Sequence, residues 1–502
     1  MPNPLYDTLF APLVGQDRVL LRMADGRNLT AADFAALVGR LAGALIAAGV
    51  TPGDRVAVQV AKSPEALALY GASVAVGAVF LPLNTAYTVA ELDYFLGNAR
   101  PRLLVCDPAQ TASLTPLCVA HDAQVLDLSG RGTGRLMDLS GQHEAMFSPV
   151  DRVGSDLAAM LYTSGTTGRS KGAMLSHDNL LSNARVLADL WHFTERDVLL
   201  HALPIFHTHG LFVASNVSLL TGGQMVFLPG FDVEQVLAAL PDTTVMMGVP
   251  TFYTRLLEDA RLSRNLVDHM RLFISGSAPL LSETHIAFEA RTGKRILERY
   301  GMTETNMNTS NPHDGDRRAG TVGLPLPGVE VRIMADGREV APGEVGVIEV
   351  RGPNVFQGYW QMPDKTAEDL RPDGWFITGD LASRDDDGYV TIVGRAKDLI
   401  ITGGYNVYPK EVEEVLDALP GIMESAVIGL PHPDFGEAVF AVLVCPRGTE
   451  PDIAGIRAAV ADKLAKFKHP KAFAIVDALP RNTMGKVQKA ELRKIHAGAF
   501  QP

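Results

Sequence analysis

The chain has 502 residues and a formal net charge of −12, with 47% hydrophobic and 20% charged residues. The length predicts roughly three domain-sized units, and the acidic balance argues against a nucleic-acid-binding protein. Its three cysteines, Cys106, Cys118 and Cys445, form no Cys-x-x-Cys pair, so neither a zinc site nor a disulfide framework is indicated and a reducing cytoplasm fits. The first ten residues lack a basic segment, so no signal peptide is expected.

The first third of the chain alternates between strand and helix patterns. Thr30 is a good N-cap for a helix at 31–48, and Ser63-Pro64-Glu65 begins the next. Strands are expected at 55–60, 79–83 and 103–106, and a further helix at 90–98. Residues 66–83 carry no charge but are rich in Ala and Gly, which predicts a buried helix and a strand without stable membrane insertion. The alternation predicts an α/β domain with mainly parallel sheets. Residues 131–148 are polar and irregular, as expected for a surface loop.

A loop rich in glycine and hydroxyl groups, called the opening loop below, follows a short strand at 158–162. It reads Thr163, Ser164, Gly165, Thr166, Thr167, Gly168, Arg169, Ser170, Lys171, Gly172. Free backbone N–H groups, hydroxyls and a lysine together can enclose a phosphate. The order is not that of a Walker A loop, and a flexible linker has a similar composition. A polar stretch then leads into a helix expected at about 177–190.

The middle of the chain continues the α/β pattern and then changes period. Strands are expected at 197–202, 225–227, 244–248, 271–275 and 296–300. Between 329 and 393 the apolar residues alternate with polar ones, and Asp336-Gly337 is a hairpin turn, which predicts an antiparallel sheet or small β barrel. We therefore expect a large N-terminal domain (1–394, with the β-rich part at about 329–394), a hinge at 395–398 and a small, mobile α+β domain at 399–502.

Four further segments join the opening loop in a fixed order. They read Glu298-Arg299-Tyr300-Gly301-Met302-Thr303-Glu304, Thr378-Gly379-Asp380, Gly394-Arg395-Ala396-Lys397-Asp398 with Gly403-Gly404, and Arg481-Asn482-Thr483-Met484-Gly485-Lys486. Each segment alone is weak evidence, but the set of five resembles the signature motifs of the adenylate-forming (acyl-CoA synthetase) superfamily over essentially the whole chain. The resemblance implies a ligase that forms an acyl-AMP and pyrophosphate from a carboxylate and MgATP, and then transfers the acyl group to coenzyme A.

The resemblance also implies roles for individual residues. Thr163, Ser164, Gly165, Thr166, Thr167, Gly168 and Lys171 would hold the β- and γ-phosphates; Gly276, Ser277, Ala278 and Tyr300 would flank adenine; Asp380 and Arg395 would bind the ribose. Thr303 would contact the α-phosphate, and Glu304 would bind Mg²⁺, an ion that prefers hard oxygen ligands. In isolation, each of these residues is also compatible with a structural or surface role.

The C-terminal motifs imply a moving part. Lys486 would stabilise the attack of the carboxylate on the α-phosphate, Lys397 would be the hinge, and Gly403 and Gly404 would line the pantetheine tunnel. Acetylation of Lys486 would remove its charge, and this hypothesis implies a lysine acetyltransferase and a deacetylase as partners.

The identity of the acid depends on Arg299. Strand alternation places Arg299 opposite in direction to Tyr300, and a guanidinium beside an acyl pocket calls for a partner such as a second substrate carboxylate. A structural pair with Glu298 or Glu304 is the alternative. The acyl pocket is expected near residues 206–210, 275–278 and 299–308, and His207, Ser277 and Met302 are the other candidates for it.

The sequence around Arg299 and from Gly320 to Val329 resembles that of malonyl-CoA synthetases. This resemblance implies that the acid substrate is malonate, with methylmalonate as a second substrate. Rival interpretations are a medium-chain or aryl-acid ligase, an adenylation enzyme that loads a separate carrier protein, a luciferase-like oxygenase and a non-catalytic nucleotide-binding protein.

Overall fold

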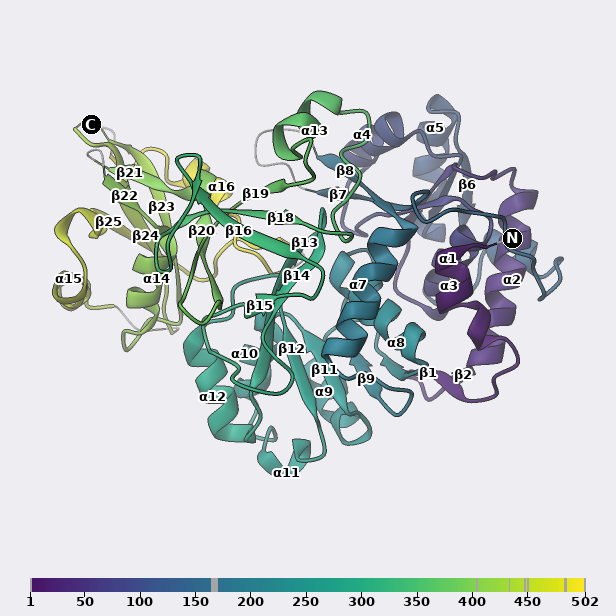
Figure 1. Ribbon diagram of the computed structural model, residues 1–502, viewed down its shortest axis with the longest axis horizontal. Helices are drawn as coiled ribbons and strands as arrows, with labels where there is room; N and C mark the ends of the chain where they lie inside the picture. The colour runs from purple at the N-terminus through teal and green to yellow at the C-terminus, as the bar shows by residue number, and fades with distance from the viewer. Residues whose placement is uncertain are drawn as a thin grey trace.

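The computed structural model describes residues 2–163, 170–402, 405–432, 434–446, 448, 451–482 and 485–500. In this part of the chain the strands form four sheets (Figure 1). The elements β21–β25 and α14–α16 lie at one end of the molecule, and α1 and α2 lie at the other (Figure 1). No helix among these residues has the length and apolar character that crossing a bilayer requires.

A six-stranded sheet forms from the first third of the chain, in the order β6-β5-β3-β4-β7-β8. Its strands are β3 (Arg55–Gln59), β4 (Val79–Pro82), β5 (Leu103–Cys106), β6 (Gln124–Asp127), β7 (Leu157–Thr163) and β8 (Lys171–Ser176). All pairs are parallel except β7 with β8, which is antiparallel. The associated helices are α1 (Pro4–Leu9), α2 (Ala31–Ala47), α3 (Pro64–Ala75), α4 (Val89–Ala99), α5 (Thr111–Ala120) and α6 (Arg135–Ser140).

Two local predictions for this region are wrong. Residues 131–148 were expected to be a surface loop, but they contain α6, whose Leu136 is fully buried. The polar stretch after the opening loop is the strand β8. Its pairing with β7 depends on a tertiary contact, and the short pattern Lys-Gly-Ala-Met-Leu-Ser does not signal it.

A nine-stranded sheet forms the second layer, in the order β15-β14-β13-β12-β11-β9-β10-β1-β2. Its strands are β1 (Val19–Met23), β2 (Asn28–Thr30), β9 (Val198–His201), β10 (Gln224–Phe227), β11 (Val245–Gly248), β12 (Leu272–Ser275), β13 (Ile296–Met302), β14 (Asn306–Ser310) and β15 (Leu324–Pro325). The central strands are parallel. The helices of this part are α7 (His177–Leu190), α8 (Asn216–Thr221), α9 (Val233–Ala239), α10 (Pro250–Glu258), α11 (Arg264–Val267) and α12 (Ser282–Thr292).

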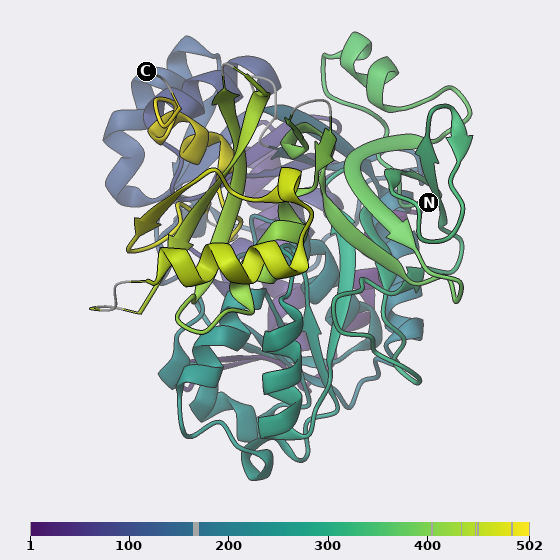
Figure 2. The same cartoon turned by 90° about the vertical axis from the view of Figure 1, so that its left-hand side faces the viewer.

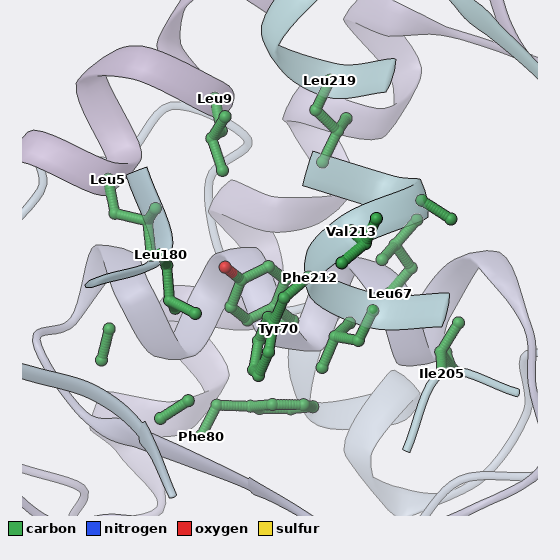
Figure 3. Close-up of a cluster of buried hydrophobic side chains, with 14 of the residues drawn as sticks. Leu5, Leu9, Leu67, Tyr70, Phe80, Leu180, Ile205, Phe212, Val213 and Leu219 are labelled. Atoms are coloured by element: carbon green, nitrogen blue, oxygen red, sulfur yellow. The ribbon is translucent and has the colours of Figure 1, made fainter. Parts of the chain in front are cut away.

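The two layers share a core around Tyr70 of α3 (Figure 3). The Tyr70 ring lies 5.4 Å from that of Phe80 and 5.7 Å from that of Phe212, measured between ring centroids. Phe212 belongs to a π-helical segment, η3 (His209–Ser215), which continues directly into α8. π-Helical turns occur frequently at functional sites, and this one is anchored in the core by its apolar side chains.

The β-rich part of the large domain is a five-stranded antiparallel sheet in the order β17-β16-β18-β19-β20. Its strands are β16 (Glu330–Ala335), β17 (Arg338–Glu339), β18 (Gly346–Arg351), β19 (Phe376–Arg384) and β20 (Val390–Arg395), with α13 (Pro363–Asp369) between β18 and β19. The expected hairpin turn is present, because Asp336 and Gly337 both have positive φ. The end strands β17 and β20 do not pair with each other among the described residues, so this sheet is open and the barrel prediction is wrong.

The last hundred residues form the expected α+β unit, which faces the viewer in Figure 2. Its strands are β21 (Ile400–Thr402), β22 (Tyr405–Val407), β23 (Glu424–His432), β24 (Gly436–Val444) and β25 (Ala472–Val476), and its helices are α14 (Pro409–Asp417), α15 (Ile453–Lys463) and α16 (Lys489–Ile495). The fold class predicted for the whole chain, parallel α/β layers followed by antiparallel β and a small α+β unit, is confirmed.

Candidate active site

The candidate site lies where several parallel strands of the nine-stranded sheet end. Ser275 at the end of β12 pairs with Glu298 of β13, which places Gly276 next to Arg299. Ligands of open α/β sheets bind beyond the carboxyl ends of the strands. The residues that the motifs selected therefore meet at one edge of this sheet.

Tyr300, Asp380 and Arg395 form one hydrogen-bonded group. The Tyr300 hydroxyl donates to Asp380 Oδ2 at 2.5 Å, and Arg395 Nε lies 2.6 Å from Asp380 Oδ1. Asp380 and Arg395 are cross-strand neighbours on β19 and β20, which explains why two distant motifs meet. Burial and the nearby Asp380 carboxylate raise the pKa of the Tyr300 hydroxyl well above its usual value. An aromatic ring beside a carboxylate and a guanidinium suits a nucleoside, with its apolar base and its ribose hydroxyls.

Glu304 is buried in a second group close by. Its Oε1 accepts a hydrogen bond from the Tyr359 hydroxyl at 3.1 Å. Lys171 Nζ lies 4.2 Å from the centre of the Tyr359 ring and 3.4 Å from an oxygen of Asp369. Burial raises the pKa of the Glu304 carboxyl, and the positive charge of Lys171 opposes this effect. A single buried carboxylate fits Mg²⁺, which typically takes one or two protein carboxylates together with substrate phosphates.

The opening loop connects two paired strands. Thr163 at the end of β7 is in register with Lys171 at the start of β8, so the two ends of the loop are cross-strand neighbours. Lys171 faces the group around Glu304. The remaining predicted phosphate-binding residues, Ser164, Gly165, Thr166, Thr167 and Gly168, lie outside the described residues.

Arg299 lies in the wall of the expected acyl pocket and is only 2% exposed. A Cβ atom at Gly276 would lie 2.4 Å from Arg299 Cζ, so the guanidinium rests directly against this glycine. Its Nε and Nη2 are buried and find no hydrogen-bond acceptor among the described residues. Burial lowers the pKa of Arg299 to about 9. As strand alternation predicts, the two side chains point to different places: Tyr300 bonds Asp380, whereas Arg299 lies against Gly276.

Neither of the two protein carboxylates proposed as alternative partners forms an ion pair with Arg299 among the described residues. The charge of Glu298 still acts on Arg299, and Glu298 Oε2 is buried without a hydrogen-bond partner. Glu298 Oε1 accepts a hydrogen bond from the Leu280 backbone N–H at 3.2 Å, and burial raises the pKa of the Glu298 carboxyl to about 7. Glu304 bonds Tyr359. Among the described residues, no carboxylate lies within ion-pair distance of Arg299.

His209 completes this pocket. It lies in the segment 206–210 that was expected near the acyl group, but it was not selected as a site residue. Ser277 Oγ lies 3.2 Å from His209 Nδ1, and His209 Nε2 is buried without a hydrogen-bond partner among the described residues. Burial and the nearby Arg299 charge lower the pKa of His209 well below its usual value, so the ring is neutral. Ser277 holds φ at 71°, a left-handed conformation that non-glycine residues seldom adopt. Met302 lies further along β13, where its sulfur is 4.0 Å from the Tyr300 hydroxyl.

Thr303 and His207 line a small hollow together with Phe206, Asn84 and Tyr162. Burial and the charge of Lys486 lower the pKa of His207 to about 3, so this ring is also neutral. The charge of the C-terminal Lys486 therefore reaches His207.

The C-terminal unit brings Lys486 to this site. The charges of Arg395, Asp380 and Glu304 all act on its ammonium, and burial together with Arg395 lowers the pKa of Lys486. The Lys486 backbone N–H donates to Asn482 Oδ1 at 2.9 Å. A Cβ at the neighbouring Gly485 would lie 3.5 Å from Thr251 Oγ1 of α10, so this turn rests on the large domain.

Two predictions for the C-terminal unit, the hinge and the pantetheine tunnel, stay predictions. Lys397 lies in an exposed turn, η5 (Ala396–Asp398), between the β-rich sheet and the C-terminal unit, and its hinge role stays a prediction. Gly403 and Gly404 lie outside the described residues.

The comparisons with known proteins agree with this geometry. The family model "AMP-binding enzyme" matches residues 13–360, and "AMP-binding enzyme C-terminal domain" matches residues 411–486. ATP-bound MatB from Rhodopseudomonas palustris has 54% identity and a TM-score of 0.98, with 100% of each chain covered. Feruloyl-CoA synthase from an Amycolatopsis species is 38% identical over 93% of this chain and 94% of the relative. Malonate–CoA ligase from Arabidopsis thaliana is 35% identical over 83% of this chain and 74% of the relative. The chain belongs to the AMP-binding enzyme family.

Proposed function

We propose that this protein is an AMP-forming acid–CoA ligase whose acid is malonate, and thus a malonyl-CoA synthetase. In the first step malonate attacks the α-phosphate of ATP and releases pyrophosphate. In the second step the malonyl group moves from AMP to the thiol of coenzyme A. Methylmalonate is the expected second substrate, because it differs only by one methyl group.

The observation that carries the choice of acid is the unpaired guanidinium of Arg299. Burying an uncompensated charge is costly, so such a group persists where a ligand supplies the opposite charge. The second carboxylate of malonate would accept hydrogen bonds from Nε and Nη2 in the bidentate geometry that arginine favours. A monocarboxylic acid would leave these N–H groups unsatisfied. The similarity to MatB and to malonate–CoA ligases supports the same choice.

His209 would give the second carboxylate a further hydrogen bond. When Ser277 donates its hydroxyl to Nδ1, the proton of the neutral ring sits on Nε2, which then faces the pocket as a donor. The Arg299 charge helps to keep the ring neutral. Ser277 would therefore act on the substrate through His209, and Met302, whose sulfur lies 4.0 Å from the Tyr300 hydroxyl, remains a predicted acyl contact.

The nucleotide would occupy the remaining groups. Tyr300 would pack on adenine beside Gly276 and Ala278, Asp380 and Arg395 would bind the ribose, and Thr303 would contact the α-phosphate. Thr163, Lys171 and the loop between them would hold the departing phosphates. Glu304 would hold Mg²⁺, which when bound neutralises phosphate charge.

Lys486 would stabilise the negative charge that develops when the malonate carboxylate meets the α-phosphate. Its present position supports this role. With equal identity and coverage, the TM-score is 0.98 to ATP-bound MatB and 0.85 to apo MatB, so the chain as a whole resembles the ATP-bound form more closely. Rotation about Lys397 would then withdraw the lysine and bring Gly403 and Gly404 to coenzyme A. Acetylation of Lys486 would remove its charge, so an acetyltransferase and a deacetylase would control the first step. The three free thiols suit a cytoplasmic enzyme.

The test is an ATP–pyrophosphate exchange panel with malonate, methylmalonate, sulfoacetate, propionate, butyrate and ferulate. We expect kcat/KM for malonate to exceed that for butyrate by at least about 100-fold, because butyrate leaves the Arg299 donors unpaired. Equal exchange with butyrate or ferulate would refute the proposal. Sulfoacetate is included because a sulfonate also pairs with a guanidinium and a relative is a sulfoacetate–CoA ligase; a preference for it over malonate would reassign the acid.

A further inference from the structure

Lys62 is a buried lysine outside the catalytic groups described so far. It lies in the turn between β3 and α3, at the end of a strand of the six-stranded sheet. Its Nζ lies 2.7 Å from the backbone oxygen of His201, 2.9 Å from that of Leu203 and 2.8 Å from His201 Nδ1. These acceptors belong to the end of β9 and the segment after it, in the nine-stranded sheet. Lys62 therefore ties the two sheets together at the edge where the candidate site lies.

The environment of Lys62 suits an ammonium group. A protonated lysine has three N–H donors, and the three acceptors around Nζ match that number. Nζ also lies 4.2 Å from the centre of the Phe227 ring, within range of a cation–π contact. Among the described residues no carboxylate forms an ion pair with Lys62, so the ammonium is stabilised by these neutral groups alone. Burial lowers the pKa of Lys62 well below its usual value, and the three acceptors act in the opposite direction.

The contact with Lys62 sets the tautomer of His201. Because the ammonium can only donate, Nδ1 must accept and the ring proton sits on Nε2. His201 Nε2 lies 2.9 Å from the Gly210 backbone oxygen and 3.2 Å from Ser215 Oγ. Burial and the Lys62 charge lower the pKa of His201 well below its usual value, which keeps the ring neutral. A hydrogen-bonded chain therefore runs from Lys62 through His201 into the π-helical segment η3.

A close backbone contact also fixes the position of η3 relative to the segment that follows β9. A Cβ atom at Gly210 would lie 2.0 Å from the Pro204 backbone oxygen, so the segment that Lys62 holds packs directly against the start of η3. The residue before Gly210 is His209, whose ring faces Ser277 in the acyl pocket. The residues that precede it, 202–208, have little regular structure of their own, so their position depends on such contacts.

We propose that Lys62 is a positioning residue for the acid pocket: its hydrogen bonds to the end of β9 and to His201 set the place of η3 and thereby aim His209 at the substrate's second carboxylate. This inference rests on the proposed malonate specificity. Lys62 is not among the residues assigned above to the acid or to the nucleotide. Its loss is expected to act on the recognition of the acid and to spare the binding of ATP.

The test uses Lys62→Met, which keeps the unbranched stem and removes the three donors. We expect kcat/KM for malonate in pyrophosphate exchange to fall at least about tenfold, with KM for ATP within about twofold, so that the malonate-to-butyrate ratio falls by the same factor. Lys294→Met is the matched control, because Lys294 Nζ also donates to a backbone carbonyl, that of Asp268, but on the surface. The control is expected to match the wild type.

A double-mutant cycle separates positioning from general stabilisation. If Lys62 acts through His209, the malonate effects of Lys62→Met and His209→Phe will be strongly less than additive, because the second change removes what the first misplaces. A purely structural lysine would give additive effects and equal losses for malonate, butyrate and ATP, and would overturn the inference. Lys62→Gln retains part of the hydrogen bonding and is expected to be intermediate; it takes over the test if Lys62→Met does not fold.

The outcome for the wild type distinguishes the two proposals. If the wild-type enzyme shows no preference for malonate over butyrate, the proposed function fails. If the wild type prefers malonate and both Lys62 variants keep that preference unchanged, the proposed function stands and the role of Lys62 is refuted.

Discussion

Replacement of Arg299 by methionine should make the free protein more stable and less active. The guanidinium is buried, and its pKa is lowered to about 9, whereas arginine in water titrates above about 12. At about 1.4 kcal/mol per pKa unit, the charged form is disfavoured by about 4–5 kcal/mol in the folded state. Structural relaxation and water penetration reduce such penalties, so we expect Arg299→Met to gain about 2 kcal/mol. Methionine keeps an unbranched apolar stem, which limits the cost of repacking.

The pH dependence follows from the sign of the pKa change. The folded state binds the Arg299 proton less tightly than the unfolded chain does, so the penalty is complete below pH 9 and declines as the pH rises above 9. The gain from Arg299→Met should therefore be full at pH 7 and smaller at pH 10. Thermal unfolding measures both values, and the expected rise in Tm at pH 7 is about 2–4 °C.

Malonate should reverse the order of stability. It supplies the missing charge to the wild type, so malonate alone should raise the Tm of the wild type and leave that of Arg299→Met unchanged. Arg271→Met is the matched control, because Arg271 donates two hydrogen bonds to Asp197, at 2.6 and 2.8 Å, and its loss should destabilise the protein. If Arg299→Met melts below the wild type by as much as Arg271→Met does, the Arg299 guanidinium has a protein partner and the reasoning fails.

The other predictions concern the nucleotide, the metal and the electrostatics of β13. Lys486→Ala should slow malonate-dependent pyrophosphate exchange at least about 100-fold while transfer from supplied malonyl-AMP to coenzyme A stays within about threefold; equal losses would contradict a role confined to the first step. Asp380→Asn should raise KM for ATP about tenfold and affect KM for malonate far less, and the reverse pattern would remove Asp380 from the ribose site. Tyr359→Phe removes the hydrogen bond to Glu304 and should increase the Mg²⁺ concentration for half-maximal activity a few-fold; an unchanged requirement would exclude this support. Burial raises the pKa of the Glu298 carboxyl to about 7, above its value in the unfolded chain, so the wild type should lose stability as the pH rises from about 5 to about 7. Glu298→Gln should make this decrease in Tm smaller.

Local signals in the sequence predicted the elements whose determinants are local. Thr30 caps α2 as expected, with its side chain accepting from the Asp33 backbone N–H and the Asp33 side chain completing a capping box. The helix at 177–190 also has the predicted bounds, with Ser176 as its cap. In contrast, β8 becomes a strand only by pairing with β7, and α6 is stabilised by burying Leu136. Neither tertiary contact has a signature in the few residues concerned.

The same distinction holds for the candidate site. Tyr300, Asp380 and Arg395 belong to motifs whose spacing in the chain is distinctive, and the structure brings all three together. Tyr359 and His209 belong to the site by contact alone. A signal for His209 was present, since it lies two residues after His207 in a segment already expected to line the pocket. For Tyr359 the segment Gly358-Tyr359-Trp360 offers no chemical pattern that sets it apart.

Gly276 contributes no side-chain atom to the pocket, yet the selection of the acid depends on it because it leaves room for the Arg299 guanidinium. The Arg299 guanidinium occupies the space in which a Cβ atom would stand, 2.4 Å away. A single methyl group there would force the guanidinium to move from its present position. The preference for a dicarboxylic acid therefore depends on both positions. A change at either one is enough to lose it, whereas a ligase that lacks both must acquire an arginine at 299 and a glycine at 276 to gain it.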